Sequence, residues 1–413
     1  MNIPILEHQL EALAKTGIIK DVILAINQVT SHLLIKEILD HFRKKFHIRI
    51  ILSVEMEPLG TLGPVKLAKD LILDKNHDGC FFVLNSDIVI GGSKGEDLYP
   101  LQQMALFHGL HGKKATILTT KVQDPWKYGE IIQQEDGKII SIVEKPNYFV
   151  SDQVNAGIYL LSNEVFDDIG LNQENIVNNL FYTLKDQGEL YAFALNEECY
   201  WMDIGNPQDY LQAQKMVLDH IHTSSYLEGE LIQSDISKDQ TSDVLNPETQ
   251  MMYEEDFLLQ KQGQTAKQYQ NLHQHSHIQK SYLTQSHLQE QFAYIIPPVL
   301  IHDTALVHPS SVIGPHVVIG PRTFVGPGCK IQNSTIMSDC NIQGNSLIKD
   351  SIIGWRCTVG MWCRIQNTSV TGEDVQIENE VMLDSHMISP HLKITRAKIE
   401  AMEENKNYKA III

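Results

Sequence analysis

The stretch Phe81-Phe82-Val83-Leu84-Asn85-Ser86-Asp87 is an apolar run, rich in residues that favour β-strands, which stops abruptly at three polar residues. Such a run predicts a buried parallel strand that delivers a carboxylate at its C-terminal end. In open α/β sheets the ligand crevice lies just outside such strand ends. We therefore place the chemistry at Asp87, as a ligand to a hard cation. The alternative is that Asn-Ser-Asp merely begins a turn.

Strands and helices alternate on both sides of this run, which predicts βαβ units and a parallel sheet. Further strands are expected at Asp21–Ile26, Ile48–Val54, Ala115–Val122 and Leu190–Leu195. Closely spaced strand patterns between residues 129 and 161 predict a mixed extension that covers one side of the crevice. The run Tyr200-Trp201-Met202-Asp203 again ends in a carboxylate, and Pro207 suits the first turn of a closing helix. Trp201 could equally be a pocket wall or simple core packing.

A six-residue repeat follows from Ile301 onward. Aliphatic residues recur with this period, and after a slip in register the pattern resumes; the predicted inward positions are Ile301, Val307, Ile313, Ile319, Val325, Ile331 and Met337, then Ile353, Val359, Ile365, Thr371, Ile377 and Leu383. A period of six is the signature of a parallel β-helix. Cys357 and Cys363 occupy the small inward position of successive repeats, which favours core packing over a metal site.

A Gln-, His- and Ser-rich segment separates the two patterns, from His220 to Gln291. We interpret it as a linker or insertion that is the least ordered part of the chain, with at most a transient helix. Its alternating His273, His275 and His277 favour solvated low complexity over a metal site. The predicted domains are therefore residues 1–219, an insertion at 220–296, and a β-helix at 297–413.

Composition narrows the function classes. The chain has 413 residues, a net charge of -18 and no basic stripe, which argues against a nucleic-acid partner. No apolar run approaches the roughly 20 residues that span a bilayer, so we expect no membrane partner. Six cysteines without a CxxC pair or a secretory signal predict reduced thiols in a cytoplasmic protein.

Several short motifs, taken in order, resemble the sugar-nucleotide pyrophosphorylases, and most closely the catalytic, β-type GDP-mannose pyrophosphorylases (mannose-1-phosphate guanylyltransferases). The resemblance covers about residues 2–214 and 301 to the C-terminus, and its most specific pieces are Glu57-Pro58-Leu59-Gly60-Thr61, Val83-Leu84-Asn85-Ser86-Asp87, Val143-Glu144-Lys145-Pro146, Val154-Asn155-Ala156-Gly157-Ile158-Tyr159, Trp201-Met202-Asp203-Ile204-Gly205 and Ile353-Gly354-Trp355-Arg356-Cys357. It implies a Rossmann-like nucleotidyltransferase domain of α/β class, followed by a left-handed parallel β-helix. It also implies synthesis of GDP-mannose and pyrophosphate from GTP and mannose 1-phosphate.

The resemblance assigns roles to particular residues. It implies that Asp87 and Asp203 hold Mg²⁺, with Asp87 and Lys145 as the catalytic pair and Lys145 meeting the sugar phosphate. The substrate-binding residues it implies are Gly60 and Thr61 at the base, with Asn85, Glu144, Asn155 and Gly157 around the sugar. For Glu144 and Lys145, an exposed charged pair that closes a strand is the alternative interpretation. We expect the protein to be a homo-oligomer or a hetero-oligomer with a related subunit.

The family opens with a strand and a Gly-rich loop containing Gly-Thr-Arg, followed by Pro-Lys-Pro, and this stretch does not occur in the sequence. Met1 lies where the helix after the loop should start, so two interpretations stand: a truncated or mis-started enzyme, and a non-catalytic regulatory or scaffold subunit. Activity of the chain as written is doubtful in either case. Without that strand, the strands at Asp21–Ile26 and Cys80–Ser86 either keep a gap between them or close up and pair.

Overall fold

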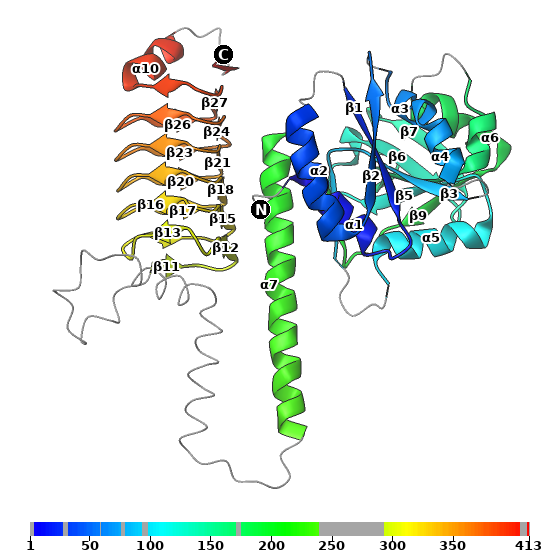
Figure 1. Cartoon of the computed structure of the whole chain (residues 1–413), viewed down its shortest axis with the longest axis horizontal. Helices are drawn as coiled ribbons and strands as arrows, with labels where there is room; N and C mark the ends of the chain where they lie inside the picture. Colours follow the sequence, from blue (N-terminus) through cyan, green and yellow to red (C-terminus); the bar gives the residue numbers. More distant parts are fainter. Residues whose placement is uncertain are drawn as a thin grey trace. The chain divides into compact units, whose positions relative to one another are not determined.

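The computed structural model describes residues 4–27, 32–57, 59–75, 79–92, 98–170, 175–238, 293–404 and 411–412. The chain divides into two compact units, which we call the α/β unit, Ile3–Ile204, and the β-helix unit, Gly205–Ile413 (Figure 1). Within the described ranges, no helix combines the length and the apolar character that crossing a membrane requires.

The α/β unit follows the predicted alternation of helices and strands. Its first half contains α1 (Ile5–Ala14), β1 (Asp21–Asn27), α2 (His32–Phe46), β2 (Arg49–Glu55), α3 (Gly63–Leu67), α4 (Lys69–Lys75), β3 (Cys80–Leu84), β4 (Ile88–Gly91) and α5 (Pro100–His111). Its second half contains β5 (Ala115–Lys121), η1 (Pro125–Lys127), β6 (Gly129–Gln133), β7 (Ile139–Glu144), β8 (Gln153–Ser162), η2 (Asn163–Asp167), the π-helical η3 (Ile176–Phe181), α6 (Tyr182–Gln187), β9 (Leu190–Ala194) and β10 (Tyr200–Asp203).

The main sheet of this unit is mixed, with strand order β7-β6-β8-β5-β9 and β3 attached to β8. β5 and β9 are parallel, as expected, but β8 runs antiparallel to its neighbours β3, β5 and β6. The prediction that Phe81–Ser86 forms a buried parallel strand is therefore wrong in two respects. β3 is antiparallel to β8, the strand that lies between β3 and β5, and none of its residues is fully buried.

Strands β1 and β3 do not pair with each other. Among the described strands, β1 pairs only with β2 and β3 only with β8. Nevertheless Val22 of β1 and Phe82 and Leu84 of β3 pack against the same apolar cluster. None of the residues of β1 or β3 is fully buried, whereas β5 is buried over all but its last residue. Of the two outcomes expected for these strands, the structure has the one in which they stay apart.

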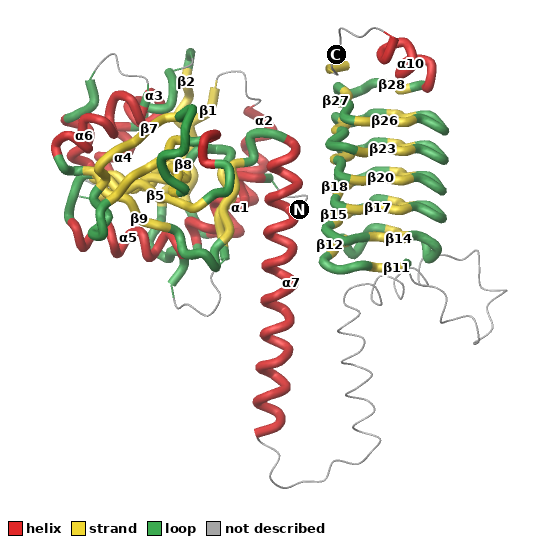
Figure 2. The backbone as a smooth tube through the Cα atoms, turned by 180° about the vertical axis from the view of Figure 1, so that it is seen from behind, coloured by secondary structure: helices red, strands yellow, loops and turns green. Residues whose placement is uncertain are grey.

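The β-helix unit consists of three parallel sheets whose strands stack coil upon coil (Figure 2). The first sheet contains β11 (Tyr294–Ile295), β14 (Val312–Ile313), β17 (Lys330–Gln332), β20 (Leu347–Lys349), β23 (Arg364–Gln366) and β26 (Met382–Asp384). The second contains β12 (Val299–Ile301), β15 (Val317–Ile319), β18 (Ser334–Ile336), β21 (Ile352–Ile353), β24 (Val370–Thr371), β27 (Met387–Ile388) and β29 (Ile411–Ile412). The third contains β13 (Leu306–Val307), β16 (Phe324–Val325), β19 (Asn341–Ile342), β22 (Thr358–Val359), β25 (Gln376–Ile377) and β28 (Lys393–Ile394), and α10 (Arg396–Glu404) follows the last coil.

The six-spaced residues form the core of this left-handed parallel β-helix, which confirms the predicted fold. Ile313, Val325 and Ile365 are completely buried, and Thr371 is nearly so. Met337 is the exception, because Ile336 takes the inward position in its place. The register of the ladder gives the reason: Val299 pairs with Val317 one coil later, but Val317 pairs with Ser334. One coil is therefore a residue shorter than the coil before it.

Small residues fill the second inward position of the coils. Four of the six free cysteines are buried here, and each thiol donates a hydrogen bond to a backbone carbonyl of the next coil; the four are Cys329, Cys340, Cys357 and Cys363. Burial raises the pKa of each of these thiols. The prediction that Cys357 and Cys363 are core residues is confirmed, because protonated thiols paired with carbonyls are not metal ligands.

Helix α7 (Pro207–Lys238) begins at the predicted proline but continues into the segment predicted to be a linker. It belongs to the β-helix unit because its side chains bind the coils. Gln214 Nε2 donates to the carbonyl oxygens of His316 at 3.1 Å and Ser334 at 3.3 Å. Asp219 accepts a 2.8 Å contact from His316 Nε2. The units thus divide after Ile204, earlier than the predicted boundary at residue 219, and the rest of the predicted linker, with His273, His275 and His277, lies outside the described residues.

A closed hydrogen-bonded ring ties α5 to the main sheet. The backbone N–H of Lys113 donates to His111 Nδ1 at 2.9 Å, so a neutral His111 must carry its proton on Nε2. His111 then donates to Thr116 Oγ1 at 2.8 Å, and the Thr116 hydroxyl donates to His108 Nδ1 at 2.8 Å. His108 Nε2 donates in turn to Ser162 Oγ at 3.2 Å, and Ser162 Oγ donates to the Lys113 carbonyl at 3.4 Å. Each hydrogen bond of the ring has one donor and one acceptor only if both imidazoles are neutral.

We expect this ring to make the α/β unit sensitive to acid. Burial, followed by the nearby His111, lowers the pKa of His108 from 6.5 to about 4. Between these values the unfolded chain binds a proton that the folded chain does not. Stability contributed by neutral His108 is therefore complete above pH 6.5 and is lost as the pH falls towards about 4. At about 1.4 kcal/mol per pKa unit, the loss amounts to about 3 kcal/mol.

The measurement is hydrogen exchange of the α5 amides at pH 7.5 and pH 5, corrected for intrinsic exchange. Wild type should lose protection at the lower pH, and His108→Leu should show a smaller pH dependence. His41→Gln, which changes an exposed histidine of α2, is the matched control and should behave like wild type. Equal pH dependence in wild type and His108→Leu would show that the ring does not carry the effect.

Candidate active site

Two carboxylates predicted from distant parts of the sequence lie on neighbouring strands. β10 pairs antiparallel with β4, which places Asp203 opposite Ile88. The N–H of Ile204 donates to the carbonyl oxygen of Asp87 at 2.8 Å. Asp87 itself ends the turn that joins β3 to β4, so the turn interpretation of Asn85-Ser86-Asp87 is also correct. The pairing brings Asp87 and Asp203 side by side at the backbone level; their role as metal ligands stays a prediction.

The turn that carries Asp87 is held from both sides. Asn85 N–H donates to the carbonyl oxygen of Gly157 at 2.9 Å. Gly157 has φ +69°, and a Cβ added there would lie 2.8 Å from Asn85 Nδ2, so only glycine fits. On the other side, Gln9 Nε2 of α1 donates to the carbonyl oxygens of Asn85 at 2.7 Å and Ile88 at 3.0 Å. The sequence prediction missed Gln9, whose only signal is a buried polar residue in the apolar face of a helix.

Asn155 and Tyr159 connect the turn to the end of β7. Asn155 Oδ1 accepts from the N–H of Gly157 at 3.0 Å, and its Nδ2 donates to the Tyr159 hydroxyl at 3.2 Å. Burial is the main cause that raises the pKa of Tyr159 to about 12; the Asn155 hydrogen bond opposes the rise, and the negative charges of Glu144 and Asp87 contribute to it. Asn155 therefore contacts both Gly157 and the buried phenol of Tyr159, a residue that the sequence prediction did not identify.

Glu144 and Lys145 are exposed at the end of β7, as the charged-pair interpretation expects. Glu144 lies opposite Gly129 of β6, where an added Cβ would be 2.6 Å from Glu144 Oε2 and 3.8 Å from Asn155 Cβ. Gly129 thus leaves space in which the Glu144 carboxylate reaches towards Asn155. The next residue, Lys145, has φ +43°, an unusual left-handed conformation for a lysine, and its N–H donates to the carbonyl oxygen of Tyr128 at 3.1 Å.

Gly60 and Thr61 lie on a separate loop, between β2 and α3. Gly60 has φ +69°, a left-handed backbone conformation that favours glycine. Thr61 Oγ1 accepts from the N–H of Ile176 at 3.0 Å, so its hydroxyl anchors the start of η3. A contact with a nucleotide base stays a prediction for both residues.

Trp201 is a core residue. It is 6% exposed, packs at a ring distance of 5.6 Å against Tyr128, and donates from Nε1 to the Ala156 carbonyl at 2.8 Å. Of the two interpretations left open, core packing is the one the structure supports.

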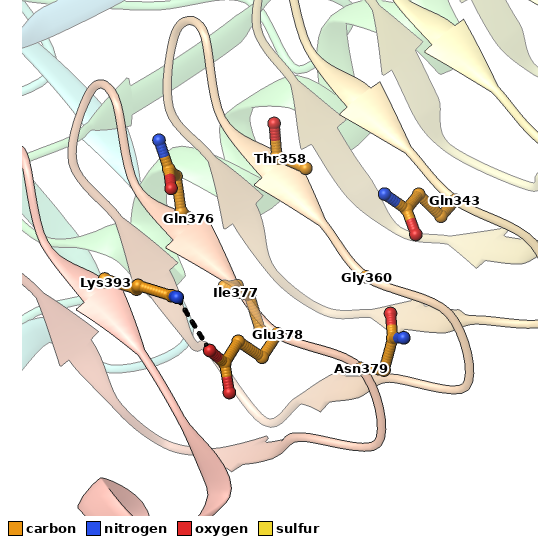
Figure 3. A pocket seen from close by; sticks show the side chains of 8 residues that line it. All are labelled: Gln343, Thr358, Gly360, Gln376, Ile377, Glu378, Asn379 and Lys393. Atoms are coloured by element: carbon orange, nitrogen blue, oxygen red, sulfur yellow. Dashed lines mark ion pairs between the residues drawn. The ribbon is translucent and has the colours of Figure 1, made fainter.

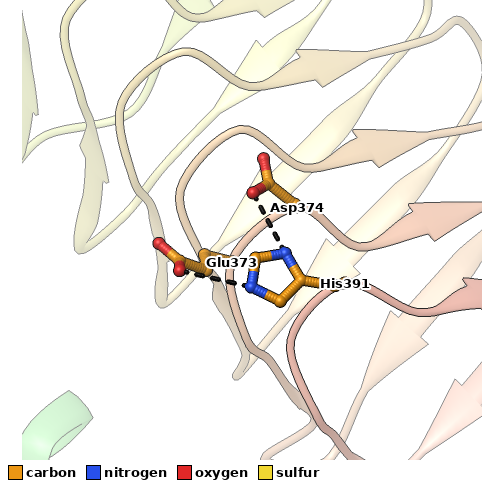
Figure 4. A group of neighbouring side chains, drawn as sticks. All are labelled: Glu373, Asp374 and His391. Atoms are coloured by element: carbon orange, nitrogen blue, oxygen red, sulfur yellow. Dashed lines mark ion pairs between the residues drawn. The ribbon is translucent and has the colours of Figure 1, made fainter.

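Two polar features of the β-helix unit lie outside this constellation. Residues in or next to β22, β25 and β28, with Gln343 after the end of β19, line an open pocket in which Lys393 pairs with Glu378 at 2.8 Å (Figure 3). On another corner, ligand-type atoms of Glu373, Asp374 and His391 lie within 4.8 Å of one another (Figure 4).

The guanidinium of Arg356 already occupies both carboxylates of that corner. It donates to Glu373 at 2.7 Å and to Asp374 at 2.8 Å, and it holds the pKa of Asp374 below its usual value. We interpret this group as a surface ion-pair network, and we assign it no metal.

Two family models match the chain. Residues 1–220 match the model described as "Nucleotidyl transferase", and residues 295–403 match the model described as "GMPPB C-terminal domain". Among solved structures, HddC from Yersinia pseudotuberculosis covers 50% of this chain and 83% of its own, at 25% identity and a TM-score of 0.40. That overlap is too partial to contribute to the assignment.

Curated relatives are similar over nearly the whole chain. "Mannose-1-phosphate guanylyltransferase 1" of Arabidopsis thaliana is 34% identical over 394 residues, which is 95% of this chain and 89% of the relative. "Mannose-1-phosphate guanylyltransferase catalytic subunit beta" of Xenopus tropicalis is 35% identical over 397 residues, which is 96% of this chain and 90% of the relative. With both domains in the same order and this identity across them, the chain belongs to the mannose-1-phosphate guanylyltransferase family.

Proposed function

We propose that this protein is a nucleotidyltransferase that makes GDP-mannose and pyrophosphate from GTP and mannose 1-phosphate. The observation that carries the proposal is the pairing of β4 with β10, which sets Asp87 and Asp203 side by side next to the predicted sugar-pocket residues. In such a reaction the sugar phosphate attacks the α-phosphorus of GTP in line, so the protein contributes position and charge neutralisation.

Each residue has a distinct role in this proposal. Asn155 and Gly157 line the sugar pocket with Asn85, and Glu144 accepts hydrogen bonds from sugar hydroxyls. Lys145, exposed beside Glu144, meets the sugar phosphate with its ammonium. Gly60 and Thr61 hold the guanine base. The geometric support is the chain of contacts from Asn85 through Gly157 to Asn155, together with the position of Asn155 and Glu144 beside Gly129.

Nucleotidyl transferases generally use a divalent metal. We propose Mg²⁺, because two neighbouring aspartates supply the hard oxygen ligands that this ion prefers. When bound, the ion neutralises charge on the phosphate oxygens of the nucleotide. Asp87 and Asp203 are the residues that would hold it.

We also propose that the protein works in the cytoplasm within an oligomer of identical or related subunits. Its six cysteines are free thiols, which supports a reducing compartment. The Xenopus tropicalis relative is named a catalytic subunit, which supports an assembly.

Binding of GDP-mannose tests the proposal independently of turnover. Calorimetry with the full chain should detect binding of GDP-mannose and of mannose 1-phosphate. It should detect no binding of UDP-glucose at the same concentration. Glu144→Gln should weaken the binding of mannose 1-phosphate about tenfold, because a charged acceptor is lost. Glu135→Gln, another exposed glutamate on the β6–β7 turn, is the matched control and should bind like wild type. A chain that binds neither mannose compound would contradict the proposed function.

A further inference from the structure

The loop that carries Lys145 has little apolar anchoring. It joins β7 to β8 over residues 145–152. Its two aromatic side chains, Tyr148 and Phe149, are 70% and 72% exposed, and only Pro146 is buried. The conformation of this loop must therefore depend mainly on its polar contacts.

One buried side chain accepts two of the backbone hydrogen bonds at the far end of the loop. Glu130 of β6 is completely buried, and its Oε2 accepts from the N–H groups of Val150 and Ser151, both at 2.7 Å. At the near end, the N–H of Lys145 is bound to the Tyr128 carbonyl. Three backbone N–H groups of the loop are thus bound to one short stretch of chain, residues 128–130, and the carbonyl oxygen of Asp152 accepts from the N–H of Val122 at 3.1 Å.

Glu130 is a poor choice for stability alone. Its sheet partners are Val143 and Val154, and Val154 is completely buried. Its other oxygen, Oε1, is buried and has no hydrogen-bond partner among the described residues. A buried carboxylate with half of its capacity unused costs free energy that an apolar side chain would not, and replacing such groups by apolar ones is often neutral or stabilising.

We propose that Glu130 is a positioning residue, which holds the 145–152 loop in one conformation and thereby fixes Lys145 for the sugar phosphate. The proposal rests on the role of Lys145 in the proposed function. Lys145 has φ +43°. A residue with a side chain stays in such a backbone conformation only when the surrounding structure imposes it. The two N–H bonds to Glu130 hold the far end of the loop, and the Tyr128 contact holds the near end. Loss of the bonds to Glu130 lets Lys145 relax to an ordinary backbone conformation, which moves its ammonium.

Two substitutions at Glu130 separate the acceptor from the side-chain volume. Glu130→Gln keeps a carbonyl oxygen that can accept from both N–H groups, whereas Glu130→Met keeps the length without an acceptor. In the full chain, hydrogen exchange at Val150 and Ser151 should stay slow in Glu130→Gln and become at least about tenfold faster in Glu130→Met. The free energy of unfolding of the α/β unit should not fall in Glu130→Met, because an apolar side chain at this position packs between valines.

Affinity for mannose 1-phosphate provides the readout that a merely structural role would not move. Glu130→Met should raise the Kd about tenfold, and Glu130→Gln should restore it to near the wild-type value. Lys145→Ala should weaken binding in the wild-type background but add little in the Glu130→Met background, because the two substitutions remove the same contact.

Three results would overturn the proposal: unchanged exchange at Val150 and Ser151 in Glu130→Met, an unchanged Kd in that variant, or full additivity with Lys145→Ala. Failure of the proposed function looks different. Wild type would then bind no mannose 1-phosphate and Lys145→Ala would change nothing, which removes the role of Lys145, while the exchange comparison still accepts or rejects Glu130 as the anchor of the loop.

Discussion

Fusing a β-strand and a Gly-rich loop ahead of Met1 is expected to raise both the guanylyltransferase activity and the stability of the protein well above those of the 413-residue chain alone. The physical reason is the separation of β1 and β3, each of which pairs on one edge only among the described strands. A backbone N–H or C=O group left unpaired in a dry place costs about 1–3 kcal/mol. Several such groups together rival the roughly 5–15 kcal/mol that holds a whole domain.

The half-buried state of both strands points the same way. Val22, Phe82 and Leu84 contribute to one apolar cluster, yet none of them is fully buried. A strand between them would cover these side chains and pair both edges. Open edges also invite pairing between chains, so we expect the 413-residue chain to associate at lower protein concentrations than the extended protein.

The assay is GDP-mannose formation from GTP, mannose 1-phosphate and Mg²⁺, with size-exclusion chromatography and thermal unfolding alongside. The matched control is an extension of equal length in which two strand positions are proline, which cannot donate to the sheet ladder. Robust turnover by the 413-residue chain alone would show that the phosphate-binding elements lie elsewhere. Binding of GDP-mannose without turnover in the extended protein would favour the non-catalytic subunit.

The second large effect is expected at the paired aspartates. Asp87→Asn and Asp203→Asn in the extended protein should each lower kcat on the order of 100-fold or more, since each removes a charge that would hold the metal at the developing phosphate charge. The side chains keep their shape, so stability should change little. Asp186→Asn, which alters a 74%-exposed aspartate paired with Lys185 on α6, is the matched control.

Metal dependence separates a ligand from a residue that only supports the turn. The Mg²⁺ concentration for half-maximal rate should rise in both variants, and Mn²⁺ binding followed by electron paramagnetic resonance should weaken. Wild-type metal dependence together with a lowered kcat would assign these aspartates to a role other than metal binding. Full activity in either variant would show that the substituted aspartate is not part of the site.

The sequence alone determined the features that depend on short-range pattern. A six-residue repeat of aliphatic residues is compatible only with short strands that each point one aliphatic side chain inward. The β-helix from Ile301 onward could therefore be predicted without any long-range information. The ends of apolar runs likewise indicated Asp87 and Asp203, because a polar residue after a strand marks the edge of a sheet. The small inward cysteines, Cys357 and Cys363, followed from their place in the same period.

Tertiary structure decided the features that depend on which distant segments meet. β3 pairs with β8, which lies between β3 and β5, and it runs antiparallel to β8. No local sequence pattern specifies that β3 and β8 pair. Ile336 replaces Met337 because one coil is shorter than the coil before it, which only the ladder register reveals. Gln9 and Glu130 each bind backbone groups far away in the chain, and a buried polar side chain acquires its role only from the partner that folding brings to it.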